Sequence, residues 1–320
     1  MDALDKKILC ELDLDCRQPA AKIARKVRSS RAVVGYRIRN LEKEGMIRSY
    51  FTAINLGKLG YSTYKIYFKL FNLGEKEEDS LYSFMQKSKN VIHCLKTEGA
   101  FDLSIVVAAR SVKELDAFLT SLKNSFSSII KDYQISIVVS SRVFKLSKLL
   151  LNKRQELLKI EKFSGTTESV KITESDKLIL SCIATNATMP VVEIANKTKL
   201  SVDIAKYRLR KLKDTGVINT FRVILDMNKL GFYHYVILVK TRRAAKKDED
   251  MINSWAMAHP NVMYVTKRIG DWDYEINVAL TSIEGFNVFI SGMRKQFSGM
   301  LESYDTIINT RIIKLNYLPL

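Results

Sequence analysis

Residues 17–48 read RQPAAKIARKVRSSRAVVGYRIRNLEKEGMIR, and residues 188–219 read TMPVVEIANKTKLSVDIAKYRLRKLKDTGVIN. In the first stretch a short helix is predicted to begin at Pro19, because proline is tolerated in a first helical turn, where its missing N–H would have no partner. A longer helix is predicted to begin at Ser30, a good N-cap, and to stop at Gly45, a residue type favoured just past a helix end. Together with apolar residues at helical spacing over residues 4–12, this order is typical of a helix-turn-helix.

The two stretches belong to a repeat that covers most of the 320 residues. From Asp5 to Tyr61, 18 of 57 positions are identical to the residue found 171 positions later, and the same offset lays Gly99 on Gly270. This self-similarity predicts two copies of one unit, about 1–142 and 173–315, with 143–172 as the joint between them.

Beyond each helix-turn-helix the period changes to that of strands. One side of the segment 64–70 is predicted to carry Tyr64, Ile66, Phe68 and Leu70, and the other side Lys65, Tyr67 and Lys69, as in a half-buried strand. A helix near 79–87, strands near 91–97 and 103–109, a helix near 112–126 and a strand near 133–139 complete a ferredoxin-like βαββαβ order.

The predicted fold class is therefore α+β. We expect a tandem repeat of a winged helix-turn-helix domain followed by a βαββαβ domain. The predicted domains are the first helix-turn-helix at 1–55, the first βαββαβ domain at 60–142, a basic amphipathic linker at 143–172, the second helix-turn-helix at 173–226 and the second βαββαβ domain at 231–316.

The last helix of each helix-turn-helix is the candidate DNA-reading element. In the first copy Val34, Ile38 and Leu41 make an inward stripe, which leaves arginines, a tyrosine and small residues facing outward. Arginine can donate two bonds to guanine in the major groove, and small residues allow the backbone to come close. The predicted DNA-contact set is Arg28, Ser30, Arg31, Ala32, Gly35, Tyr36, Arg37 and Arg39 in the first copy, and Lys199, Ser201, Val202, Asp203, Lys206, Tyr207, Arg208 and Arg210 in the second.

The charge balance supports a polyanionic partner. The chain has 52 Lys and Arg against 34 Asp and Glu, a net charge of +18. Residues 17–48 hold ten basic and two acidic residues, and residues 188–222 hold eight basic and three acidic ones. Double-stranded DNA is therefore the expected partner. Asp203 stands where the first copy has Ala32, so the two copies are not expected to read the same bases.

The composition of the chain indicates its cellular location and which kinds of disulfide or metal site are expected. The four cysteines, Cys10, Cys16, Cys94 and Cys182, form no Cys-x-x-Cys pair, which disfavours a disulfide framework or a zinc site. A signal peptide and a membrane-spanning run are not expected, so the predicted location is the cytoplasm. We expect no metal and no cofactor.

The order of motifs resembles the Lrp/AsnC family, the feast/famine transcription regulators of bacteria and archaea. The resemblance rests on Leu-Asp-x-x-Ile-Leu at residues 4–9, on YRIRNLEKEGMI at residues 36–47, and on a βαββαβ module with a Gly-x-aromatic-Asp loop. It covers each repeat from end to end. It implies DNA binding, self-association through the βαββαβ domains, and a small effector, often an amino acid, near that loop.

The resemblance carries over unevenly to the two loops. GDWD at residues 270–273 keeps the family pattern, whereas GAFD at residues 99–102 has lost the first acidic residue. The predicted effector-contact set is Gly99, Asp102, Gly270, Asp271 and Asp273. A purely structural role also fits, because glycine and aspartate stabilise tight turns between strands. The fusion itself departs from the usual layout of the family, since one polypeptide supplies a built-in pseudo-dimer.

Two other functions share this architecture or this surface. Fused relatives of the same fold act as sirohaem decarboxylases, but His93, His234 and His259 are the only histidines here, and none lies in a His-Asn-Tyr-x-Arg run as in those enzymes. We therefore expect that the chain is not an enzyme. A scaffold that binds acidic proteins through the arginine faces is the remaining alternative.

The joint is predicted to contain a basic amphipathic helix that docks on the neighbouring domain rather than on a membrane. Its apolar stripe is Leu146, Leu149, Leu150, Leu157 and Ile160, and the basic residues around it are Lys145, Lys148, Lys153, Arg154, Lys159 and Lys162.

Overall fold

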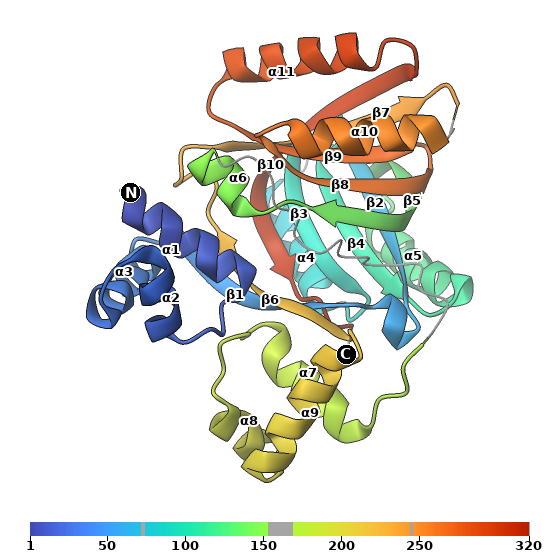
Figure 1. Cartoon of the computed structure of the whole chain (residues 1–320). Coiled ribbons are helices and arrows are strands. Elements are labelled where there is room, and N and C mark those ends of the chain that lie inside the picture. The colour runs from blue at the N-terminus through green and yellow to red at the C-terminus, as the bar shows by residue number, and fades with distance from the viewer. Residues whose placement is uncertain (72–73, 153–168, 244–245, 320) are drawn as a thin grey trace.

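The computed structural model describes residues 1–71, 74–152, 169–243 and 246–319, and it contains the repeated unit twice (Figure 1). The first unit consists of α1 (Ala3–Leu14), α2 (Ala20–Val27), α3 (Arg31–Lys43), β1 (Ile47–Ile54), the 3₁₀ turn η1 (Gly57–Leu59), β2 (Ser62–Leu70), α4 (Glu75–Lys87), β3 (Val91–Gly99), β4 (Leu103–Ala109), α5 (Val112–Phe126) and β5 (Ile130–Val143). After α6 (Leu146–Leu151), the second unit consists of α7 (Glu174–Ala184), α8 (Val191–Thr198), α9 (Val202–Asp214), β6 (Ile218–Leu225), β7 (Tyr233–Thr241), α10 (Lys246–Ala258), β8 (Val262–Gly270), β9 (Tyr274–Leu280), α11 (Ile283–Gln296) and β10 (Leu301–Leu315). This order confirms the predicted fold class.

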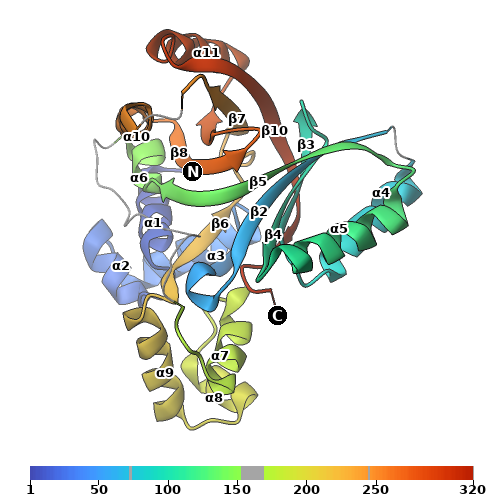
Figure 2. The ribbon, with the colours of Figure 1, turned by 90° about the vertical axis from the view of Figure 1, so that its right-hand side faces the viewer.

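The sheets of the two units close into one barrel. The strand order is β10-β3-β4-β2-β5-β8-β9-β7, so β3 of the first unit pairs with β10 of the second, and β5 pairs with β8. The two sheets therefore pair within one chain, as expected for a built-in pseudo-dimer. Figures 1 and 2 show α10 and α11 outside one part of the barrel and α4 and α5 outside another.

Barrel closure overturns one expectation about β2. Tyr64, Ile66 and Phe68 pack outward into the core beneath α4 and α5, as the alternating pattern predicts. The opposite side of the strand is not half-exposed, because it faces the barrel interior: Lys65 is only 6% exposed and Tyr67 only 1%. The second unit covers the face that an isolated ferredoxin-like sheet would present to water.

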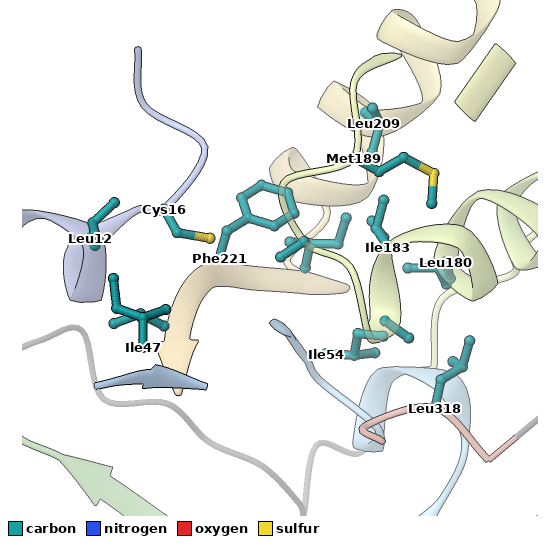
Figure 3. Packing of buried hydrophobic residues seen from close by; sticks show 14 of the residues in the cluster. Leu12, Cys16, Ile47, Ile54, Leu180, Ile183, Met189, Leu209, Phe221 and Leu318 are labelled. Atoms are coloured by element: carbon teal, nitrogen blue, oxygen red, sulfur yellow. The ribbon is translucent and has the colours of Figure 1, made fainter. Parts of the chain in front are cut away.

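The two helix-turn-helix units, which we call the first head (α1–α3) and the second head (α7–α9), are joined by a two-stranded ribbon of β1 and β6. Each head packs against the strand of the other unit. The Cys16 N–H donates to the carbonyl of Phe221 on β6 at 2.9 Å, and the Ala187 N–H donates to the carbonyl of Tyr50 on β1 at 3.3 Å. Figure 3 shows Phe221 beside Cys16 and the residues of the second head in this shared apolar core.

The described part of the joint packs against the core shared by the heads. Leu150 is buried, and Leu146 and Leu149 pack against the core shared by the heads. Lys148 is buried rather than solvated, and its amine donates to the carbonyl of Ala256 at 2.6 Å. The remaining residues of the predicted linker helix, Lys153, Arg154, Leu157, Lys159, Ile160 and Lys162, lie outside the described residues. Among the helices described, none combines the length and apolar character needed to span a membrane.

Candidate functional site

The recognition helices α3 and α9 are built in the same way. Ser30 caps α3 by accepting from the Val33 N–H at 3.2 Å, and Ser201 caps α9 by accepting from the Ile204 N–H at 3.2 Å. In α3 the inward stripe holds, with Val34 and Leu41 buried and Ile38 packed against them. The opposite face of each helix is consequently directed away from the head.

Most of the predicted DNA-contact set lies on that outer face. Tyr36 is 57% exposed and its counterpart Tyr207 is 58% exposed, so both heads present a tyrosine to solvent at the same position. The exposed predicted residues are Arg28, Ser30, Arg31, Ala32, Tyr36 and Arg39 in the first head, and Lys199, Ser201, Asp203, Lys206, Tyr207 and Arg210 in the second; Gly35 and Val202 are half-buried. Arg28 and Lys199 have left-handed backbone conformations that end α2 and α8.

Arg37 and Arg208 of the predicted set are engaged inside their own heads. The Arg37 guanidinium donates to the carboxylates of Asp2 at 2.6 Å and Asp5 at 3.1 Å. The backbone N–H of Asp5, and after it the Arg37 guanidinium, lower the pKa of Asp2. Arg208 donates to the Thr173 hydroxyl at 2.7 Å and to Asp176 at 3.1 Å. These contacts tie each recognition helix to the start of its head, and we leave both arginines out of the proposed reading face.

A lysine from the opposite unit holds the end of each recognition helix. Lys229 of the second unit donates to the carbonyl of Glu44 at the end of α3, at 2.7 Å, and Lys58 of the first unit donates to the carbonyl of Thr215 at the end of α9. Cations stabilise the carbonyl end of a helix through its dipole. The two recognition helices are thereby positioned relative to each other by contacts that cross between the units.

The two predicted effector loops lie where the units meet. At Gly270 φ is +147°, and a Cβ there would lie 2.7 Å from the carbonyl oxygen of Ile135 on β5; at Gly99 φ is +113°, and a Cβ would lie 2.6 Å from the carbonyl oxygen of Thr306 on β10. Glycine is needed at both positions for its backbone conformation and for this close approach.

The acidic residues of the loops differ in their surroundings. Asp273 accepts from the Thr241 N–H at 2.7 Å and from its hydroxyl at 2.8 Å, and Asp102 accepts from the Leu70 N–H at 2.8 Å. Both therefore hold the strand beside them. Asp271 is exposed, whereas Trp272 is buried and donates to Gln134 of the first unit at 2.9 Å.

A cavity of about 370 Å³, which we call the central cavity, occupies the barrel interior. Its inner wall carries polar side chains from both units, and its outer part is lined by residues of the ribbon, including Arg48 and Arg222. None of the inner residues belongs to the predicted sites. The only sequence signal was the alternation of polar with apolar residues in the strands, which also fits a solvated face. The inner polar residues are Thr63, Lys65, Tyr67, His93, Ser104, His234, Arg268, Glu275, Asn277 and Asn309.

Hydrogen bonds connect most of these groups. Glu275 pairs with Arg268, accepts from the Tyr67 hydroxyl, and accepts from the Asn277 amide at 2.8 Å. The amide oxygen of Asn277 in turn lies 2.9 Å from Nε2 of His234. The network therefore links β2 of the first unit to β7, β8 and β9 of the second.

Desolvation controls the protonation of the cavity. Burial, together with the charge of Arg268, lowers the pKa of Lys65 to about 7. Burial also lowers the pKa of His93 to about 3 and that of His234 to about 4, so both imidazoles are neutral at pH 7. Burial raises the pKa of Tyr67 to about 12.

The cavity is asymmetric although the chain is a repeat. Positions 171 residues apart carry different chemistry: Lys65 corresponds to Val236, Ser104 to Glu275, and Val106 to Asn277. Thr63 corresponds to His234 and Thr97 to Arg268. The fused chain therefore has one polar arrangement here rather than two equivalent halves.

Comparison with known proteins identifies relatives of each unit. A family model described as winged helix-turn-helix DNA-binding matches residues 1–48 and again residues 172–219. The HTH-type transcriptional regulator Zrp of Zymomonas mobilis is 30% identical over 121 residues, which are 38% of this chain and 79% of Zrp. The HTH-type transcriptional regulator FL11 of Pyrococcus horikoshii is 28% identical over 121 residues, with the same coverage of 38% and 79%.

A solved structure matches both units at once. The siroheme decarboxylase NirDL has a TM-score of 0.64 at 17% identity, covering 98% of this chain and 93% of NirDL. The expectation that the chain is not an enzyme is contradicted by this likeness, because an enzyme has the same two-unit architecture. At this identity the likeness shows the fold alone, and a fold does not decide between binding and catalysis.

Proposed function

Because this chain belongs to the Lrp/AsnC family of transcriptional regulators, we propose that it regulates transcription by binding two unlike DNA half-sites with its two heads. The observation that carries the proposal is the matched exposure of Tyr36 and Tyr207, each followed three residues later by an exposed arginine, Arg39 or Arg210. Residues three apart on a helix are neighbours, so each head offers one continuous tyrosine–arginine face for a major groove.

The half-sites are expected to be unlike because the faces differ elsewhere. Ala32 is exposed on α3 and Asp203 at the equivalent position of α9. A methyl group suits the methyl of thymine, whereas a carboxylate accepts from cytosine N4. The centres of the half-sites should lie about 10–10.5 bp apart, or a multiple of this, because both heads must reach the same face of the duplex.

Footprinting with single-head variants tests this proposal. Arg31→Ala and Arg39→Ala should each weaken binding by about 1–3 kcal/mol and relax base preference in one half-site, because a bidentate arginine–guanine contact is lost. Arg210→Ala should act on the other half-site. Lys113→Ala, which removes an exposed charge on α5 and not on either head, is the matched control. Wild-type protein that protects no duplex at moderate salt would refute the proposal.

We further propose that an amino acid or a related small metabolite binds beside Asp271 and modulates DNA binding. The exposed Asp271 carboxylate can pair with an ammonium group. Gly270 and Asp273 would shape that site by holding the loop. In the first unit Gly99 and Asp102 hold an equivalent loop, but Ala100 stands in place of the first acid, so one effector per chain is proposed. Calorimetry against the common amino acids measures whether any of them binds.

A second candidate function is catalysis on a carboxylated tetrapyrrole in the central cavity. The likeness to NirDL over both units favours it, together with a cavity that holds neutral histidines, a buried lysine and a buried Arg268–Glu275 pair. Sirohaem mixed with the chain should then change its visible absorbance, and a spectrum equal to the sum of the separate components would exclude this candidate.

A further inference from the structure

The inner wall of the central cavity contains one buried amine, that of Lys65, which no carboxylate of the described residues pairs with. Lys65 and Arg268 are 6% and 4% exposed, and burial of a charge is costly unless the charge is paired. Arg268 is paired with Glu275. Lys65 has the hydroxyl of Ser104 as its hydrogen-bond partner at 3.2 Å, and within residues 1–71, 74–152, 169–243 and 246–319 no carboxylate lies within 4 Å of its amine.

The Glu275 carboxylate is already in use and cannot serve Lys65. It accepts from Tyr67 and Asn277 in addition to Arg268. The ring of Tyr67 also lies near the lysine, with its centroid 5.2 Å from the amine. Such a contact stabilises a cation without neutralising it. An anion from outside the protein is the group that would complete the environment of Lys65.

Unpartnered polar atoms converge on the same cavity. In the described part of the chain, five buried side-chain atoms have no hydrogen-bond partner, and three of them line this cavity: Oγ1 of Thr63, Nε of Arg268 and Oδ1 of Asn309. Buried polar atoms in folded proteins are nearly always hydrogen-bonded, so this cluster leaves positions for the polar atoms of a ligand or of water. The Thr63 hydroxyl is the most informative, because Thr63 and Lys65 lie two residues apart on the inner face of β2.

We propose that the central cavity binds a small organic acid, whose carboxylate lies between Lys65 and Thr63 and whose apolar body packs against the surrounding wall. A carboxylate has two oxygens, one for the ammonium group and one for the hydroxyl. The wall nearby is apolar, with Val106 on β4, Val138 on β5, and Val236 and Ile307 from the second unit. The volume of about 370 Å³ is within the range of small-molecule sites.

The asymmetry of the repeat sets the stoichiometry. The second-unit counterpart of Lys65 is Val236, and the counterpart of Thr63 is His234. Val236 and His234 therefore do not repeat the pair of an ammonium group and a hydroxyl group that Lys65 and Thr63 provide. One organic acid is therefore bound per chain, in spite of the two-unit architecture. The site rests on the cavity alone, so a failure of the DNA-binding proposal would leave it standing.

Calorimetry with the full chain and two matched probes tests the proposal. Naphthalene-2-carboxylate should bind one per chain and roughly 10–100-fold tighter than naphthalene-2-carboxamide, the gain expected from hydrogen bonds to a charged group. Lys65→Met should abolish this preference, and Thr63→Val should reduce it. Lys113→Met, which removes an exposed lysine on α5, should preserve it.

Several results would overturn the inference. Equal affinity of wild type for the two probes, two equivalent sites per chain, or an undiminished preference in Lys65→Met would each exclude the Lys65–Thr63 site, as would the absence of binding of either probe. Lys65→Met is expected to fold, because it replaces a buried amine with an apolar side chain of similar length. If it does not fold, the affinity ratio measured in Thr63→Val decides.

Discussion

Raising the salt concentration from about 50 to about 200 mM is expected to lower the affinity of this chain for duplex DNA by about 10³–10⁵-fold, as for proteins that neutralise six to ten phosphates. Besides the arginines proposed to read guanine, the exposed cations of the heads that can contact phosphates include Lys22, Arg25 and Arg28 in the first head, and Lys199, Lys206 and Lys211 in the second. Each phosphate contact releases counterions from the duplex, which makes binding weaker when salt is plentiful.

The measurement is a series of binding titrations on one duplex, plotted as log K against log salt. Six to ten contacts predict a slope of roughly −5 to −9. Replacing Lys199 with alanine should make the slope less steep by about one unit, since one phosphate contact is lost. Lys113→Ala should leave the slope unchanged. A slope near zero would contradict phosphate contacts and favour an acidic protein partner for the exposed arginines.

Arg268→Met is expected to destabilise the fold by about 3–5 kcal/mol, the typical cost of leaving one member of a buried ion pair without its partner. Glu275 is 4% exposed and would retain a charge in the barrel interior with only the hydrogen bonds of Tyr67 and Asn277. The effect should be large because the Arg268–Glu275 pair lies inside the barrel that the two units form together. An unpaired Glu275 carboxylate in that position would oppose closure of the barrel.

Denaturant unfolding of the single and double variants measures this effect. Arg268→Met/Glu275→Leu should regain more than half of the lost stability, because no unpaired charge remains. The recovery is incomplete, since Tyr67 and Asn277 lose their acceptor. A loss below about 1 kcal/mol in the single variant would indicate instead that Glu275 reaches solvent or takes up a proton at low cost.

The heads are the part of the molecule that the sequence predicts well. Ser30 as N-cap, Gly45 after the helix end, and Val34 with Leu41 as the inward stripe are all local features, and each depends on residues within one or two turns. The repeat adds strength because the same features recur 171 residues later. Helix α5 begins and ends at the predicted residues for the same reason, with Ser111 as its cap.

The residues that make the contacts between the units could not be predicted from the sequence. Strands β1 and β6 were not predicted, because each is stabilised by the other across roughly 170 residues rather than by a local pattern. Lys58 and Lys229 are identical residues 171 positions apart, yet nothing in the sequence indicates that each one binds the helix end of the opposite unit.

Of the two candidate sites, one could be predicted from local sequence patterns and the other could not. The outer faces of α3 and α9 follow from helical periodicity, which places Tyr36 and Arg39 on one surface. The central cavity could not be predicted in this way. A lysine such as Lys65 among alternating strand residues indicates the solvated side of a sheet. Only closure of the barrel, which brings Arg268 and Glu275 of the second unit to face it, turns that lysine into a buried group.

Barrel closure also sets the timing of folding during synthesis. The pairing partner of β3 is β10, which begins roughly 200 residues after β3 ends, an interval of about 10–40 s at the usual rates of translation. Throughout that interval one edge of β3 is unpaired, and for the earlier part of it the first head also lacks β6 (Ile218–Leu225), the strand against which it packs. Unpaired edges are sites of wrong association. Joining both units in one gene ensures equal numbers of each. It also means that the first unit cannot complete its fold until the second unit has been synthesised.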